Sequence, residues 1–167
     1  MATPFTIAHD FPVSRDLVLK HHTDEALHER ANAALGSASR SLDSAEEQAD
    51  GTFIQRFKVD ASKEIPGAAA KVLKPEMLIW IEESVWDPKT ERFRWKVLPT
   101  AMKDKISCAG ELWYEDQGDT TRRVVQGEIT IKIPFVGKVA EQAILANLQK
   151  TYDATAKAES KYYSEQA

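Results

Sequence analysis

The alternation of hydrophobic and polar residues is clearest from residue 122 to 133. There Val125, Ile129, Ile131 and Ile133 share one parity, and polar residues mostly fill the other. Because side chains alternate between the two faces of a strand, this pattern predicts a strand with one dry face and one wet face. The segment 134–137, Pro-Phe-Val-Gly, ends it.

A helical spacing then continues almost to the end of the chain. From 138 to 163 the hydrophobic residues recur one, three and four positions apart, which predicts one buried stripe on a long helix. The members of this stripe are Val139, Ala140, Ala143, Ile144, Leu148 and Tyr152. At ~1.5 Å per residue the helix would be about 40 Å long, enough to cross a whole small sheet.

The N-terminal third predicts one strand and two short helices. Residues 5–11 alternate as a strand that Pro12 ends. Ser14 is a suitable N-cap for a helix over 15–22. A second start signal at 23–25 predicts another helix over 24–35, with Gly36 as its C-terminal stop.

The middle of the chain predicts strands separated by turns. Strands are expected over 38–49 (a polar edge strand), 53–59, 77–86, 93–97 and 106–115. The turn signals lie at 50–51, 87–90 and 117–119, and a helical turn or wide loop is expected over 68–73 after Ile65-Pro66-Gly67. Gly110 and Gly127 lie inside strands, where glycine marks a bulge or a close approach. The order is strand, two short helices, six strands and a long helix, which is an α+β class.

Composition narrows the classes of protein that fit. The 167 residues suit a single domain over 1–167, with 43% hydrophobic and 29% charged residues. A net charge of -4 without a basic excess argues against nucleic acid as a partner. No apolar run is long enough to cross a membrane, and the N-terminus lacks a secretory signal pattern. Cys108 is the only cysteine, so no internal disulfide is possible and we expect a cytoplasmic protein.

This order of elements resembles the START-like superfamily, also called SRPBCC or helix-grip, which includes the birch-pollen allergen family, lipid-transfer domains and polyketide cyclases. The segments that carry the resemblance are 11–14 (FPVS), 65–67 (IPG) followed by the strand 77–86, and 127–141 (GEITIKIPFVGKVAE). Within the superfamily the chain looks most like an uncharacterised bacterial family labelled only as a domain of unknown function. The resemblance implies a strongly curved seven-stranded antiparallel sheet wrapped around the C-terminal helix, with a cavity between them. It implies no reaction, because one scaffold hosts transport, binding and cyclisation.

The dry faces identify the wall that such a cavity would have. If they point inward, the wall is drawn from Phe53, Phe57, Phe93, Trp95, Cys108, Leu112, Ile129, Ile131, Ala140, Ile144 and Leu148. A large apolar surface with few polar points is typical of small-molecule sites. The alternative is that these side chains fill the space as a packed core.

Three polar residues share the inward parity, namely His9, Gln55 and Tyr114. A buried polar group without a partner costs about 1–3 kcal/mol, so each needs one. Our hypothesis is that some of them orient the polar end of a ligand. The alternative is that they pair with the backbone or with trapped water, or lie at the rim.

Other candidate chemistry is weak. His21, Glu25 and His28 would share one face of a continuous helix and could form a zinc site, but the helix start at Thr23 breaks their register. Cys108 needs a nearby base to act as a nucleophile and is better interpreted as a small buried hydrophobic residue. Neighbouring carboxylates such as Glu82 and Glu83 face opposite sides. We therefore assign no catalytic residue, no metal and no cofactor.

Three functional hypotheses follow. The first is a non-catalytic protein that binds or carries a hydrophobic small molecule, such as a lipid or a polyketide-like metabolite. The second is a cyclase or aromatase that uses the same cavity, with His9 and Tyr114 as the acid–base candidates. The third is an interaction module with a filled core, in which Trp80, Trp86 and Trp113 on outward parities form a contact patch. We rank them in this order, and the oligomeric state stays open.

Overall fold

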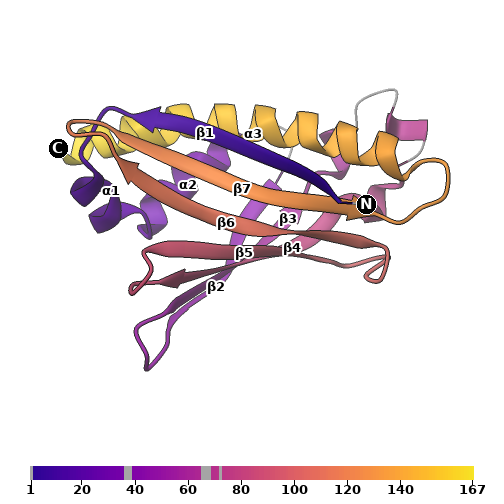
Figure 1. Ribbon diagram of the computed structural model, residues 1–167, viewed down its shortest axis with the longest axis horizontal. Coiled ribbons are helices and arrows are strands. Elements are labelled where there is room, and N and C mark those ends of the chain that lie inside the picture. The colour runs from indigo at the N-terminus through magenta and orange to yellow at the C-terminus, as the bar shows by residue number, and fades with distance from the viewer. Residues whose placement is uncertain (1, 36–38, 65–68, 72) are drawn as a thin grey trace.

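The computed structural model describes residues 2–35, 39–64, 69–71 and 73–167. Seven antiparallel strands form one curved sheet in the order β1-β7-β6-β5-β4-β3-β2, and a long C-terminal helix lies along its concave side (Figure 1). The strands are β1 (Thr3–Phe11), β2 (Ser39–Glu47), β3 (Phe53–Asp60), β4 (Ile79–Asp87), β5 (Arg92–Pro99), β6 (Ile106–Asp116) and β7 (Thr121–Ile131). The helices are α1 (Arg15–His21), α2 (Glu25–Ala33) and α3 (Gly137–Gln166). The predicted helix-grip fold is confirmed.

The local signals explain where the helices begin and end. The Ser14 hydroxyl accepts the Leu17 N–H at 3.4 Å, so it is the N-cap of α1. The first helix ends at His21 and the second begins at Glu25, as the second start signal predicts. The predicted stop at Gly36 and the Ile65-Pro66-Gly67 segment lie outside the described residues.

Some boundaries differ from the prediction. Three 3-10 turns, at Ser62–Glu64, Ala69–Lys71 and Pro75–Leu78, precede β4, which therefore begins at Ile79 rather than at Met77. Val139 is wrong as a member of the buried stripe, because its side chain is 54% exposed in the first turn of α3. Among the described residues, no helix is both long enough and apolar enough to cross a membrane.

Gly110 and Gly127 mark a close approach rather than a bulge. They face each other across β6 and β7 in an unbroken register. A Cβ atom on Gly110 would lie 1.9 Å from the Gln126 carbonyl oxygen, and one on Gly127 would lie 2.6 Å from Cζ2 of Trp95. Because Gly127 lacks a side chain, the Trp95 indole can lie over β7, where it also contacts Phe5 at a ring-centroid distance of 6.0 Å.

The core has two clusters of buried side chains, and α3 contributes to both. One cluster surrounds Phe11, Val18 and Tyr163, where α1 packs against the C-terminal half of α3. The other surrounds Ile129 and Ala140, near the start of α3. Members of both clusters line one cavity on the concave face of the sheet.

Candidate ligand-binding cavity

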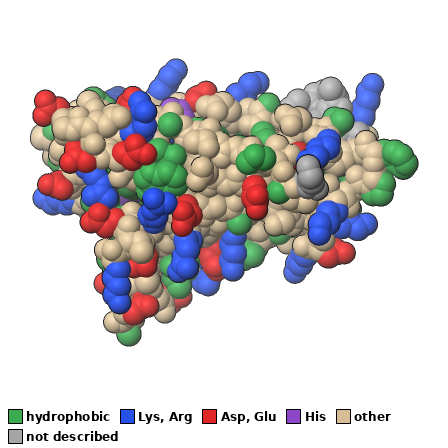
Figure 2. Space-filling view, in the orientation of Figure 1, with side chains coloured by type: hydrophobic (Ala, Val, Ile, Leu, Met, Phe, Trp, Pro, Cys, Tyr) green, Lys and Arg blue, Asp and Glu red, His purple; other side chains and the backbone are tan. Residues whose placement is uncertain are grey.

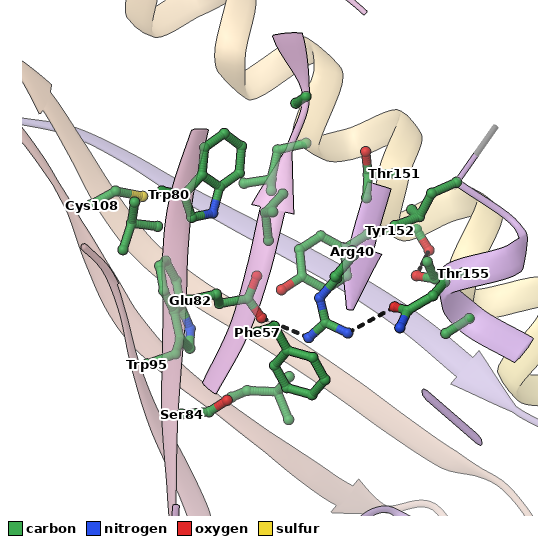
Figure 3. Close-up of a pocket in the computed structure, with 18 of the residues that line it drawn as sticks. Arg40, Phe57, Trp80, Glu82, Ser84, Trp95, Cys108, Thr151, Tyr152 and Thr155 are labelled. Carbon is green, nitrogen blue, oxygen red and sulfur yellow. Dashed lines mark hydrogen bonds and ion pairs between the residues drawn. The ribbon is translucent and has the colours of Figure 1, made fainter. Parts of the chain in front are cut away.

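The interior between the sheet and α3 contains a cavity of about 220 Å³. Its wall comes from inward side chains of β2 to β7, from α2, and from the middle and C-terminal half of α3 (Figure 3). Most of the lining is apolar or aromatic. The filled-core alternative therefore does not describe this interior.

The structure places most of the predicted wall residues on this lining. They are Gln55, Phe57, Phe93, Trp95, Cys108, Leu112, Tyr114, Ile129, Ile144 and Leu148. They meet there because residues of one parity face one another across neighbouring strands, as Phe57 faces Glu82 and Cys108 faces Ile129.

Four predicted residues lie elsewhere, namely His9, Phe53, Ile131 and Ala140. Ile131 and Ala140 are 5% and 0% exposed and pack in the second core cluster. Phe53 is half-buried at the start of β3, opposite Trp86. These residues belong to the packed ends of the concave face rather than to its hollow part.

His9 lies between β1 and α3, outside the cavity. Its Nε2 is 2.7 Å from Oδ1 of Asp153, and its Nδ1 is 3.5 Å from a guanidinium nitrogen of Arg123. No residue of β1 is part of the lining, because α3 packs along β1 and β7. The hypothetical acid–base pair of His9 and Tyr114 therefore does not face a common cavity.

An ion pair that the sequence did not reveal stands inside the cavity. Arg40 reaches in from the edge strand β2 and donates at 2.9 Å to Glu82 of β4 and at 3.0 Å to the side-chain oxygen of Asn32 in α2 (Figure 3). Its guanidinium carbon lies 3.5 Å from the Phe57 ring centroid. Only Oε1 of Glu82 takes part in this pair, and no hydrogen bond to its Oε2 is found among the described residues.

A second ion pair, Arg123 with Glu159, joins β7 to α3 on the same lining. Their side chains are 4% and 14% exposed, so the pair is almost fully removed from water. The Arg123 guanidinium also stacks near the Phe11 and Tyr152 rings, at 5.1 and 5.2 Å.

The Tyr152 side chain lines the cavity (Figure 3), and the centroid of its ring lies 5.2 Å from the guanidinium carbon of Arg123. Burial, and then the nearby Glu82 charge, raise the pKa of its phenol, while Arg123 and Arg40 partly oppose the shift. The hydroxyl is therefore protonated near neutral pH. Within the described residues it has no hydrogen-bond partner, so it can donate a hydrogen bond to a bound molecule.

Both remaining predicted polar residues have a protein partner. The Gln55 amide nitrogen lies 3.1 Å from Nε2 of His28. Burial lowers the pKa of His28 to about 4, so its ring is neutral and accepts this hydrogen bond. The Tyr114 and Tyr163 hydroxyls are hydrogen-bonded to each other, and burial raises the pKa of both.

The weaker candidates have ordinary structural roles. Burial, with a smaller contribution from Glu82, raises the pKa of the Cys108 thiol to about 12, so it stays protonated and is not a nucleophile. His21 binds Asp24 at 2.8 Å, whereas His28 binds Gln55. The zinc hypothesis required these two histidines to share one partner.

The prediction that Trp80 and Trp86 face outward is wrong. Trp80 lines the cavity, and Trp86 packs edge-on against the His22 ring at a centroid distance of 4.4 Å. The strand 77–86 has apolar residues on both faces, so its parity alone could not show which face is buried. Trp113 does lie on the outer face, where Arg92 stands 4.3 Å from its ring.

Incomplete hydrogen bonding is concentrated around the cavity. In the described part of the chain, the buried side-chain nitrogens without a hydrogen-bond partner are His22 Nδ1, Trp80 Nε1, Trp95 Nε1 and Arg123 Nε. All four belong to residues of the lining. Such groups are rare in folded proteins, and their grouping here sets this region apart from the packed core.

The fold is shared with several solved structures. The chain aligns with the Zhui aromatase/cyclase from Streptomyces sp. R1128 (13% identity, TM-score 0.66, 99% of this chain and 96% of that one). It also aligns with a START superfamily protein from Mycobacterium smegmatis (11%, 0.57, 98% and 99%) and with norcoclaurine synthase from Thalictrum flavum (18%, 0.55, 98% and 88%). A search of curated proteins finds none that matches. Residues 6–162 match the family described as "Protein of unknown function (DUF2505)", and the chain belongs to this family.

Proposed function

We propose that this protein binds and carries a small, mainly apolar molecule in the cavity between its sheet and α3. The observation that carries the proposal is the hollow interior itself. Its lining is mainly apolar and aromatic with a small number of polar groups, as in most small-molecule sites. Side chains of a packed core would ordinarily close such a space, so its persistence supports an occupant.

The volume limits the size of that occupant. An engineered cavity of about 150 Å³ holds benzene, and typical ligand pockets measure about 300–1,000 Å³. At 220 Å³ the cavity suits a compact molecule somewhat larger than one aromatic ring. The aromatic walls, which include Trp80 and Trp95, suit a flat or branched apolar body.

The polar groups of the lining favour a ligand with a few oxygen atoms. The Tyr152 hydroxyl supplies a donor and the free Oε2 of Glu82 an acceptor, within an otherwise apolar wall. A polyketide-like molecule with hydroxyl and carbonyl groups matches this set better than a plain hydrocarbon chain. The single cysteine supports a reducing compartment, and we place the protein in the cytoplasm.

Filling the cavity tests the proposal. Leu148→Trp adds bulk to the lining, and Ala146→Trp adds the same ring to the exposed side of the same helix. Native mass spectrometry of freshly purified protein should show a bound small molecule, or uptake from a panel of fatty acids and aromatic polyketides. Leu148→Trp should abolish the adduct, and Ala146→Trp should keep it. A wild type that stays empty against the whole panel would refute the carrier function.

A second candidate is an enzyme of the cyclase type. The observation that favours it is the placement of the Glu82 carboxylate and the Tyr152 hydroxyl on one lining, as a possible base and acid. Two of the similar folds are named as an aromatase/cyclase and a synthase. Once a ligand is known, incubating it with the protein and following its chemical structure over time would separate the two functions. A carrier would return the ligand unaltered. An enzyme would convert it, and the Glu82→Gln variant would lose this conversion.

A further inference from the structure

The turn between β7 and α3, residues 132–136, and the first turn of α3 expose an apolar tip. The side chain of Phe135 has a relative exposure of 104%, the highest among the large hydrophobic residues that the structure describes as exposed. Val139, one helical turn later, is 54% exposed, and Pro134 is exposed as well. The turn lies at one end of the molecule, and hydrophobic side chains project from that end in the space-filling view (Figures 1 and 2). We call Pro134, Phe135 and Val139 the apolar tip.

The backbone of this tip has an unfavourable conformation at Phe135. Phe135 has φ +68°, a region in which glycine is at ease and a bulky residue is an outlier. The turn is fixed on its far side, where the Gly137 N–H donates to the Ile133 carbonyl at 2.9 Å. There a Cβ atom on Gly137 would lie 2.2 Å from the Ile131 carbonyl oxygen.

Strain and exposure together leave Phe135 without a role in the isolated protein. A glycine would relieve the backbone, and a polar residue would suit the solvent. A strained backbone conformation at an exposed aromatic residue, with no gain in stability to offset it, indicates a functional role. The gain must then come from a partner that buries the ring.

The charges around the tip indicate the kind of partner. Lys103, Lys105 and Lys132 are exposed next to it, and the Lys132 N–H donates to the Lys105 carbonyl at 2.8 Å, which holds two of them together. Asp104 is the acidic residue within the same turn. This end is therefore locally basic, although the whole chain carries a net charge of -4.

We propose that the apolar tip docks onto the surface of an anionic lipid bilayer. Phe135 and Val139 would enter the interface, and the lysines would face the lipid headgroups. A protruding apolar point beside lysines fits an interfacial anchor, because a bilayer surface accepts a small wedge without needing a complementary pocket. This inference does not depend on what the cavity holds.

Vesicle flotation tests it with the full-length protein. Vesicles of phosphatidylcholine with 30 mol% phosphatidylglycerol should retain the wild type at low salt, and vesicles of phosphatidylcholine alone should retain much less. Salt should release the protein, since surface charges are screened within a Debye length of about 8–10 Å. Lys103→Gln with Lys105→Gln should weaken partitioning about fivefold for each lysine.

Phe135→Gly is the decisive variant. It removes the ring while relieving the positive φ, so the fold should be retained or stabilised and the partitioning should still fall about tenfold or more. Leu98→Ser, at another exposed hydrophobic residue (38%), is the matched control and should bind as the wild type does. Binding of Phe135→Gly equal to wild type, or a wild type that ignores anionic vesicles, would overturn the proposal. So would a dimer in analytical ultracentrifugation that disappears in Phe135→Gly, because the tip would then belong to a second copy of the chain.

Discussion

Replacing Glu159 by glutamine should destabilise the protein strongly, because it leaves a buried guanidinium without its counter-charge. The Arg123 side chain is only 4% exposed, and its Nε has no partner among the described residues. What remains near it is the His9 ring nitrogen at 3.5 Å and the faces of two aromatic rings, none of which carries a full negative charge.

The size of the effect follows from the burial of the pair. Removing one partner of a buried ion pair costs about 3–5 kcal/mol, and the aromatic contacts that persist place this case near the lower end. A loss of about 3 kcal/mol in the free energy of unfolding lowers the melting temperature of a domain of this size by roughly 6–12 °C. Urea denaturation followed by tryptophan fluorescence would measure it.

The adjacent residues supply the control. Arg122 and Asp10 form the same type of pair on the outer face, with exposures of 44% and 52%. Asp10→Asn should cost at most about 1 kcal/mol, since exposed pairs contribute little. If Glu159→Gln cost no more than Asp10→Asn, the claim that the inner pair is shielded from water would be refuted.

Three further predictions address the scaffold. Gly127→Ala should destabilise the sheet by about 1–3 kcal/mol in urea denaturation, because its Cβ would collide with Trp95. Burial lowers the pKa of His22 and of His28 to about 4, below the ordinary 6.5, so the unfolded chain binds more protons between these values. The contribution of these two histidines to the free energy of unfolding should be fully present above pH 6.5 and should be lost as the pH falls toward 4. In denaturation measured as a function of pH, His22→Phe should remove part of this pH dependence. Ser14→Ala should cost about 1 kcal/mol, measured in the same way, by removing the N-cap of α1.

The sequence predicts the fold well where the signals are local. Period-two alternation, the turn signals at Asp50-Gly51 and Gln117-Gly118, and the cap at Ser14 each depend on a few neighbouring residues. Their order is enough to indicate the sheet and the gripped helix. Boundaries are less well determined, because 75–78 forms a 3-10 turn where a strand would also accommodate its residues.

The polar half of the cavity depends on pairings that local patterns do not contain. β2 reads as a polar edge strand, and its register shifts between Leu42 and Ser44. Because a shift of one residue exchanges the two faces, the side of the sheet that Arg40 meets depends on this irregularity. Glu82 lies in a strand that is apolar on both faces, and only the register that sets it opposite Phe57 brings it inside.

For Arg123, the alternation along the strand predicts that the side chain faces inward, but it does not identify the carboxylate that pairs with it. It shares the parity of Val125 and Ile129, so the alternation alone puts an arginine on the dry face. A buried charge is tolerated only when it is paired, and the sequence offers many carboxylates. The carboxylate that pairs with Arg123 is Glu159, 36 residues away in the sequence, which reaches Arg123 because α3 crosses the sheet. A cavity with fixed opposite charges at two points of its wall cannot bind a featureless chain as well as a molecule with polar atoms at matching positions. Under the proposed carrier function, the two ion pairs of the lining are therefore the features of the wall that would select a ligand with polar atoms.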